Sequence, residues 1–355
     1  MLGSAPEMSQ QLRRVTRAAL CALGLSAAGV LALGACDRSP SPPAPTPSTP
    51  AAAAAKPTTT ATKPAELPPP SAPVASRLPA PPRLVAIGDL HGDFQATRRA
   101  LRLAGAIDDQ DRWIGKDLVV VQTGDQLDRG DEEKKILDLL ERLQVEAAAA
   151  GGAVHVLNGN HELMNAAGDL RYVTAGGFLD FADVPGVDPS DARASRVPAP
   201  MRGRFLAFSP GGPYARKLAA RPVILVVGET VFVHGGLSPA HVRRGIDAIN
   251  GEVQRWLRGE GEISPDILQD DESPVWTRRY CLDPRPTDCQ AVREALAAVP
   301  AKRLVVGHTV HKEGALSTCD GAVWCIDVGM AAYYGGRPEA LEIVGDQVRV
   351  LREPP

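Results

Sequence analysis

Five short apolar runs in this chain each end in a cluster of glycine with aspartate, asparagine or histidine, and this pattern limits the fold more than any other feature. The runs have the length and β-branched composition of buried strands. In an open α/β sheet the carboxyl ends of the strands line the crevice where ligands bind, so we expect the five loops to meet at one site. The runs and the loops that follow them are Leu84–Ile87 before Gly88-Asp89-Leu90-His91-Gly92, Leu118–Gln122 before Gly124-Asp125-Gln126-Leu127-Asp128-Arg129-Gly130, Val154–Leu157 before Asn158-Gly159-Asn160-His161-Glu162, Val231–Val233 before His234-Gly235-Gly236, and Leu304–Val306 before Gly307-His308.

The other apolar runs and the segments between them predict a layered α/β protein. Phe94–Leu103 and Glu132–Glu146 have amphipathic helical periodicity, and Gly345-Asp346 has the composition of a hairpin turn. Near-continuous apolar strands occur in sheets that are covered on both faces. We therefore predict a four-layer α-β-β-α sandwich, two sheets packed face to face between helices, with an exposed loop excursion at residues 183–222. Further strands are expected at Val223–Val227, Val323–Ile326, Leu341–Val344 and Val348–Leu351.

Residues 1–36 have the features of a secretion signal that ends in a lipidated cysteine. Three arginines, the last at Arg17, precede the apolar run Ala18–Leu33, which is too short to cross a bilayer comfortably. Leu33–Cys36 (Leu-Gly-Ala-Cys) resembles the bacterial lipobox, whose cysteine is acylated after cleavage. The alternatives are an uncleaved anchor, an ordinary signal peptide and twin-arginine export at Arg13-Arg14. We expect a membrane-anchored lipoprotein on the periplasmic or cell-envelope side.

Residues 37–82 differ in composition from everything after them. They are rich in proline, alanine and threonine and lack apolar periodicity. Such a segment cannot bury enough apolar surface to offset its ordering entropy, so we expect a disordered tether that reaches up to about 140 Å. Residues 83–355, which contain all the polar loops, are long enough to form one globular core and are expected to be the catalytic domain.

The charge and the cysteines narrow the classes of partner and site. The net charge of −3 gives no basic footprint for nucleic acid. No C-x-x-C spacing occurs, which argues against a thiolate zinc site. Cys21 leaves with the signal and Cys36 takes the lipid, so four cysteines remain, an even number in an oxidising compartment. Three pairings are possible, and we favour Cys281–Cys289 with Cys319–Cys325 because these need the shortest loops.

The polar loops have the chemistry of a site for two divalent ions. Oxygen and imidazole ligands without thiolate favour manganese, iron or zinc. Two metals roughly 3.5–4 Å apart bind both the attacking and the leaving oxygen of an in-line displacement, and they make hydroxide available near neutral pH. Phosphoester hydrolysis uses all of these features, so phosphoesters are the expected substrates.

The five motifs, in this order, resemble the phosphoprotein-phosphatase family of metallophosphoesterases, whose signatures are GDxHG, GDxxDRG, GNHE, HGG and GH. The resemblance covers residues 83–344. It implies that a hydroxide bridging the two metals attacks a phosphomonoester in line. His161 would then protonate the leaving oxygen, Asp128 would orient His161, and Arg129 would bind the phosphoryl oxygens. The metal ligands that the resemblance implies are Asp89, His91, Asp125, Asn160, His234 and His308, with Asp125 shared by both metals.

Four further segments are similar to the Shewanella-like branch of this family. They are Gly159–Val173, Gly211–Tyr214, Ser273–Arg278 and Gly329–Gly336. In that reading Arg278 is a second phosphate-binding arginine. The branch implies a protein phosphatase, with a leaning toward phosphotyrosine.

Two other functions and three residues stay open at this point. One alternative is hydrolysis of nucleotides or dinucleoside polyphosphates, and another is a binding module with a vestigial metal site. Asp327, Tyr333 and Tyr334 are each open between a role beside the site and a structural role.

Overall fold

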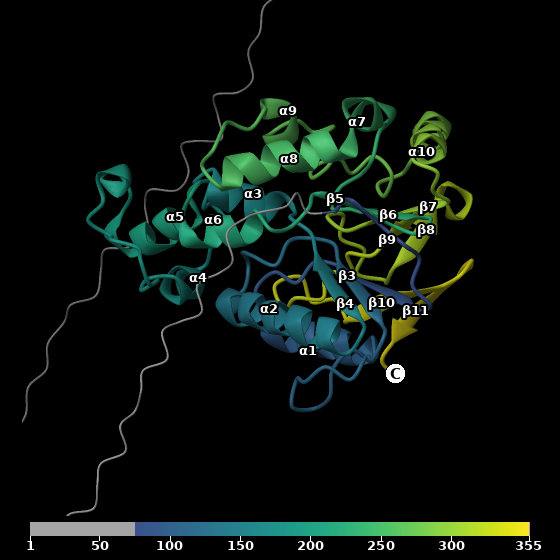
Figure 1. Cartoon of the computed structure of the whole chain (residues 1–355), viewed down its shortest axis with the longest axis horizontal. Helices are drawn as coiled ribbons and strands as arrows, with labels where there is room; N and C mark the ends of the chain where they lie inside the picture. Colours follow the sequence, from purple (N-terminus) through teal and green to yellow (C-terminus); the bar gives the residue numbers. More distant parts are fainter. Residues whose placement is uncertain (1–74, 355) are drawn as a thin grey trace, which may run out of the picture. The chain divides into compact units, whose positions relative to one another are not determined.

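The computed structural model describes residues 75–354, and two β-sheets packed face to face form its centre (Figure 1). The six-stranded sheet has the order β1 (Arg77–Leu78), β5 (Ile224–Val227), β6 (Thr230–Val233), β7 (Arg303–Val306), β9 (Val323–Cys325) and β8 (Leu316–Thr318). The five-stranded sheet has the order β11 (Gln347–Arg352), β10 (Glu339–Val344), β2 (Leu84–Ile87), β3 (Val119–Gln122) and β4 (Ala153–Val156).

The strands that precede the polar loops run parallel within each sheet. In the five-stranded sheet Ile87 lies opposite Gln122 and Gln122 lies opposite Val156, so β2, β3 and β4 end level with one another. In the six-stranded sheet β6 runs parallel to β7, with Phe232 opposite Val305. Parallel strands place the loops after them at the same edge. This register brings the loops after β2, β3 and β4 to one edge and those after β6 and β7 to one edge.

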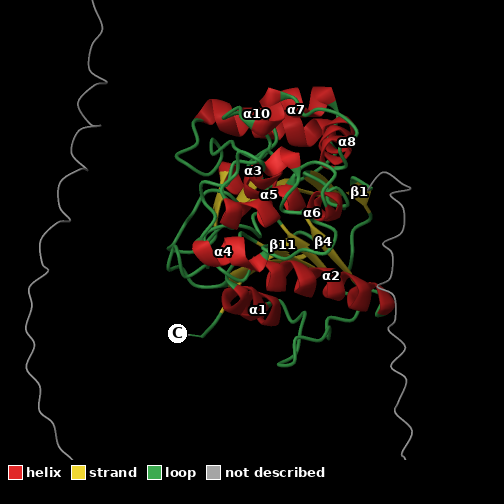
Figure 2. Ribbon diagram, turned by 90° about the vertical axis from the view of Figure 1, so that its left-hand side faces the viewer, coloured by secondary structure: helices red, strands yellow, loops and turns green. Residues whose placement is uncertain are grey.

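Helices cover the outer face of each sheet, which confirms the four layers (Figures 1 and 2). The helices α1 (Phe94–Leu103) and α2 (Glu133–Ala149) pack on the five-stranded sheet. The helices α7 (Pro239–Arg244), α8 (Ile246–Leu257) and α10 (Pro286–Ala298) lie over the six-stranded sheet. A dry layer between the sheets consists of the buried side chains of Leu84, Ala86, Val121, Leu157, Leu225, Val227, Phe232, Val305, Ile326, Leu341 and Ile343.

The expected loop excursion at 183–222 is wrong for its second half. Residues 185–198 are mostly exposed, but residues 202–208 and 213–218 form two helices in which Phe208 and Tyr214 are buried. Phe208 and Tyr214 lie 4.9 and 4.8 Å from the ring of Phe181. Pro213 starts a helix here, because the first helical position needs no backbone N–H. The other helices of the described residues, including those of this region, are α3 (Asn160–Ala166), α4 (Ala175–Asp180), η1 (Ala192–Ala194), η2 (Ala199–Met201), α5 (Arg202–Phe208), α6 (Pro213–Leu218), α9 (Pro265–Leu268) and η3 (Cys319–Gly321).

The start of the chain is described only from residue 75. The predicted signal peptide, the predicted lipidation site Cys36 and most of the predicted tether lie outside the described residues. The last part of the expected tether, however, contains β1, in which Arg77 and Leu78 pair with Val226 and Val227 of β5. The folded domain therefore begins before residue 83. Among residues 75–354, no helix is long and apolar enough to cross a membrane.

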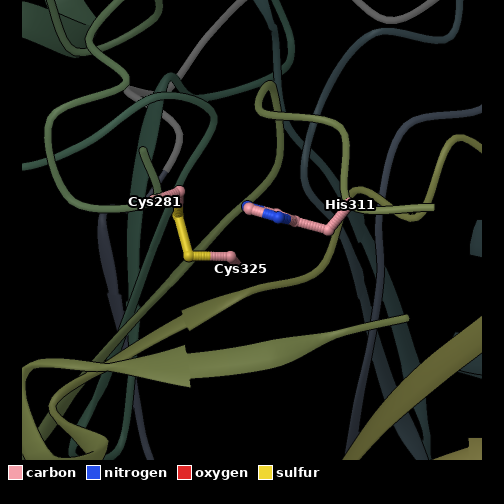
Figure 3. A group of neighbouring side chains, drawn as sticks. All are labelled: Cys281, His311 and Cys325. Atoms are coloured by element: carbon pink, nitrogen blue, oxygen red, sulfur yellow. A yellow bond between two sulfur atoms is a disulfide. The ribbon is translucent and has the colours of Figure 1, made fainter. Parts of the chain in front are cut away.

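The two disulfides join Cys281 to Cys325 and Cys289 to Cys319, so the favoured local pairing is wrong. The paired Cα atoms lie 5.9 and 5.1 Å apart, within the range that a disulfide requires. Short loop length lowers only the entropic cost of closure, and the packing of α10 on the sheet decides which cysteines meet. Figure 3 shows His311 pointing toward the Cys281–Cys325 bond, in which neither sulfur is a free thiolate.

Candidate active site

The loops after β2, β3, β4, β6 and β7 converge, as the motif pattern predicts. Arg129 is half-buried and Arg278 is exposed, and both lie beside a core of buried polar residues. That core consists of Asp89, His91, Asp125, Asp128, Asn160, His161, His234 and His308, none more than 5% exposed. Burial of so many ionisable groups together is costly unless charges are paired or bind cations, so the cluster indicates a functional site.

The backbone at this cluster is held in an uncommon conformation. Five site residues have a positive φ, between 43° and 71°: His91, Asp125, Asp128, Arg129 and His308. Non-glycine residues rarely adopt this region, and such strain gathers where function requires it. Two glycines allow close approach, since an added Cβ at Gly159 would lie 2.1 Å from Asp125 Oδ1 and one at Gly307 would lie 2.2 Å from Asp89 Oδ1.

The first group of potential ligands surrounds the ring of His91. His91 Nε2 lies 3.8 Å from Asp89 Oδ2 and 3.7 Å from Asp125 Oδ2. Burial, followed by the neighbouring His161, lowers the pKa of His91 to about 4, so this imidazole is neutral at pH 7. Burial, with Asp327 and Asp125 close by, raises the pKa of Asp89 well above its usual value.

The second group shares Asp125 with the first. His234 Nε2 lies 3.2 Å from Asp125 Oδ2 and 2.8 Å from Asn160 Oδ1. Asp125, His234 and His308 each offer a ligand atom within 4.8 Å of the others. Burial alone would raise the pKa of Asp125, but the imidazoles of His234, His161 and His91 hold it well below its usual value. Burial lowers the pKa of His308 well below its usual value.

The orientation of the histidines fits metal ions. A backbone carbonyl only accepts hydrogen bonds, so the ring nitrogen that faces one carries the proton and the other nitrogen carries a lone pair. In the neutral ring of His91 that lone pair faces carboxylate oxygens of Asp89 and Asp125, an arrangement that is repulsive without a cation between the atoms. Imidazole nitrogens with carboxylate and amide oxygens suit divalent manganese, iron or zinc. The carbonyl contacts are His91 Nδ1 to Leu127 at 3.0 Å, His234 Nδ1 to Thr123 at 3.1 Å and His308 Nε2 to Trp276 at 2.8 Å.

His161 and Asp128 form a second functional unit beside the potential metal ligands. His161 Nδ1 lies 2.5 Å from Asp128 Oδ2, and His161 Nε2 lies 3.8 Å from Asp125 Oδ2. Burial opposes the protonated imidazole, but Asp125 and Asp128 raise the pKa of His161 above its usual value. A buried histidine that retains its proton and is oriented by a carboxylate has the properties of a general acid.

Behind Asp128 lie three residues that the sequence analysis missed. Asn165 Nδ2 and Arg204 Nη2 donate to Asp128 Oδ1 at 3.0 and 3.2 Å. The backbone N–H of Asp128 donates to Glu133 Oε1. No local motif marks Arg204, which comes from α5, about 75 residues further along the chain. Asn165 does follow the GNHE motif by one helical turn and faces the same way as His161.

Arg129 lies between two tyrosines at the mouth of the site. Its guanidinium carbon lies 3.9 Å from the ring centre of Tyr172 and 4.8 Å from that of Tyr333, whose hydroxyl accepts from Arg129 Nη1 at 3.2 Å. Arg129, Tyr333 and His91 line a cleft of about 680 Å³. Arg278 Nη1 donates to the backbone carbonyl of His308. Both predicted arginines therefore lie at the rim.

Glu162 and Asp327 support the loops of the site. Glu162 accepts from the backbone N–H groups of Asp125, Gln126 and Gly159 at 2.8–2.9 Å, so it braces two of the motif loops. Asp327 Oδ1 accepts from Gly329 N at 2.9 Å, and after burial its carboxyl group is the largest cause that raises the pKa of Asp89. The open question about Asp327 is thus settled in favour of a place directly beside a potential ligand.

Two metal-binding groups that share one aspartate, beside a general-acid histidine, on two packed sheets, are the arrangement of a metallophosphoesterase. The family model for calcineurin-like phosphoesterases matches residues 82–312 of the chain, and this family uses a dinuclear metal centre. A cold-active protein tyrosine phosphatase of known structure has the same fold, with a TM-score of 0.63 and 22% identity over 78% of each chain.

Curated relatives narrow the family further. The Shewanella-like protein phosphatase 2 of Arabidopsis thaliana is 40% identical over 312 residues, which cover 79% of this chain and 80% of the relative. The Shewanella-like protein phosphatase 1 of Plasmodium berghei is 29% identical over 76% of this chain and 74% of the relative. The chain belongs to the Shewanella-like protein phosphatases of the calcineurin-like phosphoesterase family.

Proposed function

We propose that this phosphatase acts on phosphoproteins at the cell envelope and prefers phosphotyrosine to phosphoserine and phosphothreonine. The observation that carries the preference is the stacking of Arg129 between Tyr172 and Tyr333 at the cleft. An arginine in that position binds phosphoryl oxygens through its planar fork, while an adjacent aromatic ring contacts the phenyl group of the substrate. Tyr333 is 60% exposed and available for such a contact.

Each residue of the site has a separate role in the proposed reaction. Arg129 and Arg278 would bind the phosphoryl oxygens, which carry the negative charge of the transferred group. His161 would donate its Nε2 proton to the leaving oxygen, and Asp128 would orient the ring by accepting a hydrogen bond from Nδ1. Divalent cations held by the ligand groups described above would supply Lewis acidity and activate water for in-line attack.

The substrate preference is tested with matched phosphopeptides that differ only in the phosphorylated residue. We expect kcat/KM to be highest for phosphotyrosine and lower for phosphoserine and phosphothreonine. Diadenosine tetraphosphate and nucleoside monophosphates belong in the same panel. Turnover of only these nucleotides would contradict the proposal and favour the nucleotide hydrolase, and equal rates on the three peptides would contradict the tyrosine preference alone.

We assign manganese, iron or zinc to the site on the basis of its ligands. Mixed imidazole and oxygen donors without a thiolate support this choice over a Cu(I) site or an iron–sulfur cluster. Stripping the protein with a chelator and restoring each metal in turn tests the assignment. Activity that returns only with magnesium or calcium would contradict it.

The location rests on the first 36 residues of the sequence. Cys36 follows an apolar run in a lipobox-like setting, which supports an acylated anchor on the periplasmic side. Metabolic labelling with a fatty acid should label the full chain but not a Cys36→Ala variant, and only the full chain should sediment with membranes. Equal sedimentation of the two without labelling would contradict a lipid anchor.

A further inference from the structure

Arg204 is the largest fully buried side chain of the described residues, and its guanidinium contacts both hydrogen-bond acceptors and aromatic rings. Its Nε donates to Asn165 Oδ1 at 2.8 Å, and its Nη1 donates to the carbonyl of Gly177 at 2.9 Å. The rings of Phe181 and Phe208 lie 5.0 and 5.1 Å from its central carbon. Aromatic rings on the guanidinium and hydrogen bonds at its edge fix the position of this arginine.

The remaining donors of Arg204 face two carboxylates. Nη2 donates to Asp128 Oδ1 at 3.2 Å and lies 3.1 Å from Glu133 Oε1, and Nη1 donates to Glu133 Oε2. Both carboxylates are fully buried, so each needs a nearby positive charge or a proton. Arginine does not lose its proton in proteins, so Arg204 provides that charge permanently.

These contacts determine which oxygen of Asp128 faces the general acid. Asn165 and Arg204 occupy Oδ1, so Oδ2 is left for His161 Nδ1 at 2.5 Å. Glu133 holds the backbone N–H of the same aspartate, at a φ of 68° that aspartate rarely adopts. The carboxylate of Asp128 is therefore fixed on the side opposite His161.

We infer that Arg204 is a positioning residue for proton donation: it holds the Asp128 carboxylate so that His161 Nε2 faces the leaving oxygen. The inference rests on the proposed role of His161 as the general acid. The helix α5 delivers this arginine, so the helical region after the motif loops is part of the catalytic apparatus. A misplacement of about 1 Å in such a pair costs about 10²-fold in rate.

A second buried arginine in the same region provides a matched control. Arg221 is 4% exposed, and its Nη1 donates to Gln126 Oε1 at 2.6 Å. None of its hydrogen bonds reaches Asp128 or His161. Loss of either arginine removes a buried charge from the core, but only loss of Arg204 removes a contact to Asp128.

The test compares Arg204→Lys, Arg204→Gln, Arg221→Gln and His161→Asn with the wild type. For each full-length protein, kcat and KM are measured on a phosphoserine peptide and on p-nitrophenyl phosphate, with the melting temperature and the metal content. An alkoxide needs protonation as it leaves, whereas p-nitrophenolate needs little. The informative quantity is the ratio of the two kcat values, because a lower folded fraction reduces both equally.

We expect Arg204→Gln to lower kcat on the phosphoserine peptide by about 10²-fold and on p-nitrophenyl phosphate by less than about tenfold. Arg204→Lys keeps the charge but not the planar fork, so its ratio should lie between those of Arg204→Gln and the wild type. Arg221→Gln should lower the melting temperature and leave the ratio unchanged.

The outcomes separate this inference from the function on which it rests. If His161→Asn itself shows no change of the ratio, the general-acid role fails. If His161→Asn changes the ratio and both Arg204 variants do not, the positioning role alone is overturned. If Arg221→Gln changes the kcat ratio as much as Arg204→Gln does, the positioning role of Arg204 is overturned. If neither Arg204 variant folds, Arg204 is assigned to stability and the positioning role is likewise overturned.

Discussion

The two sheets build their shares of the site in different ways. The loops after β2 and β3 of the five-stranded sheet bond directly to each other: the backbone N–H groups of Leu90 and His91 donate to the Asp125 carbonyl at 2.9 and 3.0 Å. The six-stranded sheet contributes His234 and His308, together with the nearby Arg278. Both disulfides lie in this second half, and Cys281 follows Arg278 by three residues.

The difference shows that most of the catalytic groups lie on one side of the site and the covalent cross-links lie on the other. The five-stranded side carries the carboxylate ligands Asp89 and Asp125 and the general acid His161, and buried hydrogen bonds and ion pairs fix them. The six-stranded side carries imidazole ligands and a rim arginine, and covalent cross-links restrain the loop from which that arginine extends. We therefore expect damage to the first half to appear mainly in catalysis and damage to the second half mainly in stability.

The largest effect should come from the general acid in the first half. His161→Asn should lower kcat by roughly 10²–10⁴ for substrates with poor leaving groups, because the leaving oxygen then receives no proton. Aryl phosphates should lose less. Steady-state kinetics on a series of phosphate esters of rising leaving-group pKa measures this, and equal losses along the series would rule out the role.

The disulfides of the second half should have the next largest effect. Joint Cys281→Ser and Cys325→Ser replacement should lower the free energy of unfolding by about 3 kcal/mol, because the intact Cys289–Cys319 bond lies within the Cys281–Cys325 span and shortens the loop that the outer bond closes. Denaturant unfolding measures the change. Replacement of Cys289 and Cys319 is the control. It should lower the free energy of unfolding by a similar amount but raise KM less than replacement of Cys281 and Cys325, because Cys281 is the cysteine near Arg278. A destabilisation below about 1 kcal/mol for both pairs would break the contrast between the halves.

A pH dependence of stability should mark the buried acids of the first half. Burial, opposed by Arg204, raises the pKa of Glu133 to about 7. The folded protein thus holds this proton more tightly than the unfolded chain, so the contribution is full below about pH 4.5 and is lost as the pH rises through 7. The loss amounts to about 3 kcal/mol. Glu133→Gln should flatten the profile of unfolding free energy between pH 5 and 8, and an unchanged slope would contradict the assignment.

The smallest effect should concern the cleft between the halves. Tyr333→Ala removes an exposed ring beside Arg129 and should reduce the preference for phosphotyrosine over phosphoserine peptides by about tenfold. Tyr333→Phe keeps the ring and loses only the hydroxyl contact to Arg129, so it should retain most of the preference. Competition between the two peptides in one reaction measures the ratio directly, and a larger loss in the phenylalanine variant would assign the effect to the hydroxyl.

Much of the fold follows from local sequence patterns. All nine apolar runs predicted as strands correspond to strands: eight are largely buried and show a continuous apolar pattern, and the half-exposed β11 is marked by the hairpin turn Gly345-Asp346 before it. The two missed strands, β1 and β8, lie at sheet edges, where half-exposed residues such as Leu78 and Leu316 give no such pattern. The disulfide pairing was also wrong, since it depends on how α10 packs and not on spacing.

In the candidate site, too, residues in local motifs could be predicted and residues brought in by tertiary contacts could not. Its motif residues could be named because glycines beside Asp89, Asp125 and Asn160 record a close approach of backbone and side chain within each loop. Arg204 could not be named, because its partners lie far away in sequence and no periodicity links them to α5. Contacts that form only in the tertiary structure leave no local signal.

The central claim is that loops from both sheets meet at Asp125, which two cations share. Elemental analysis of the purified protein, together with Asp125→Asn, tests it most directly. The claim predicts two transition-metal ions per chain in the wild type, and both a large loss of bound metal and a large loss of activity in the variant. A variant that keeps two ions and full phosphatase activity would contradict it.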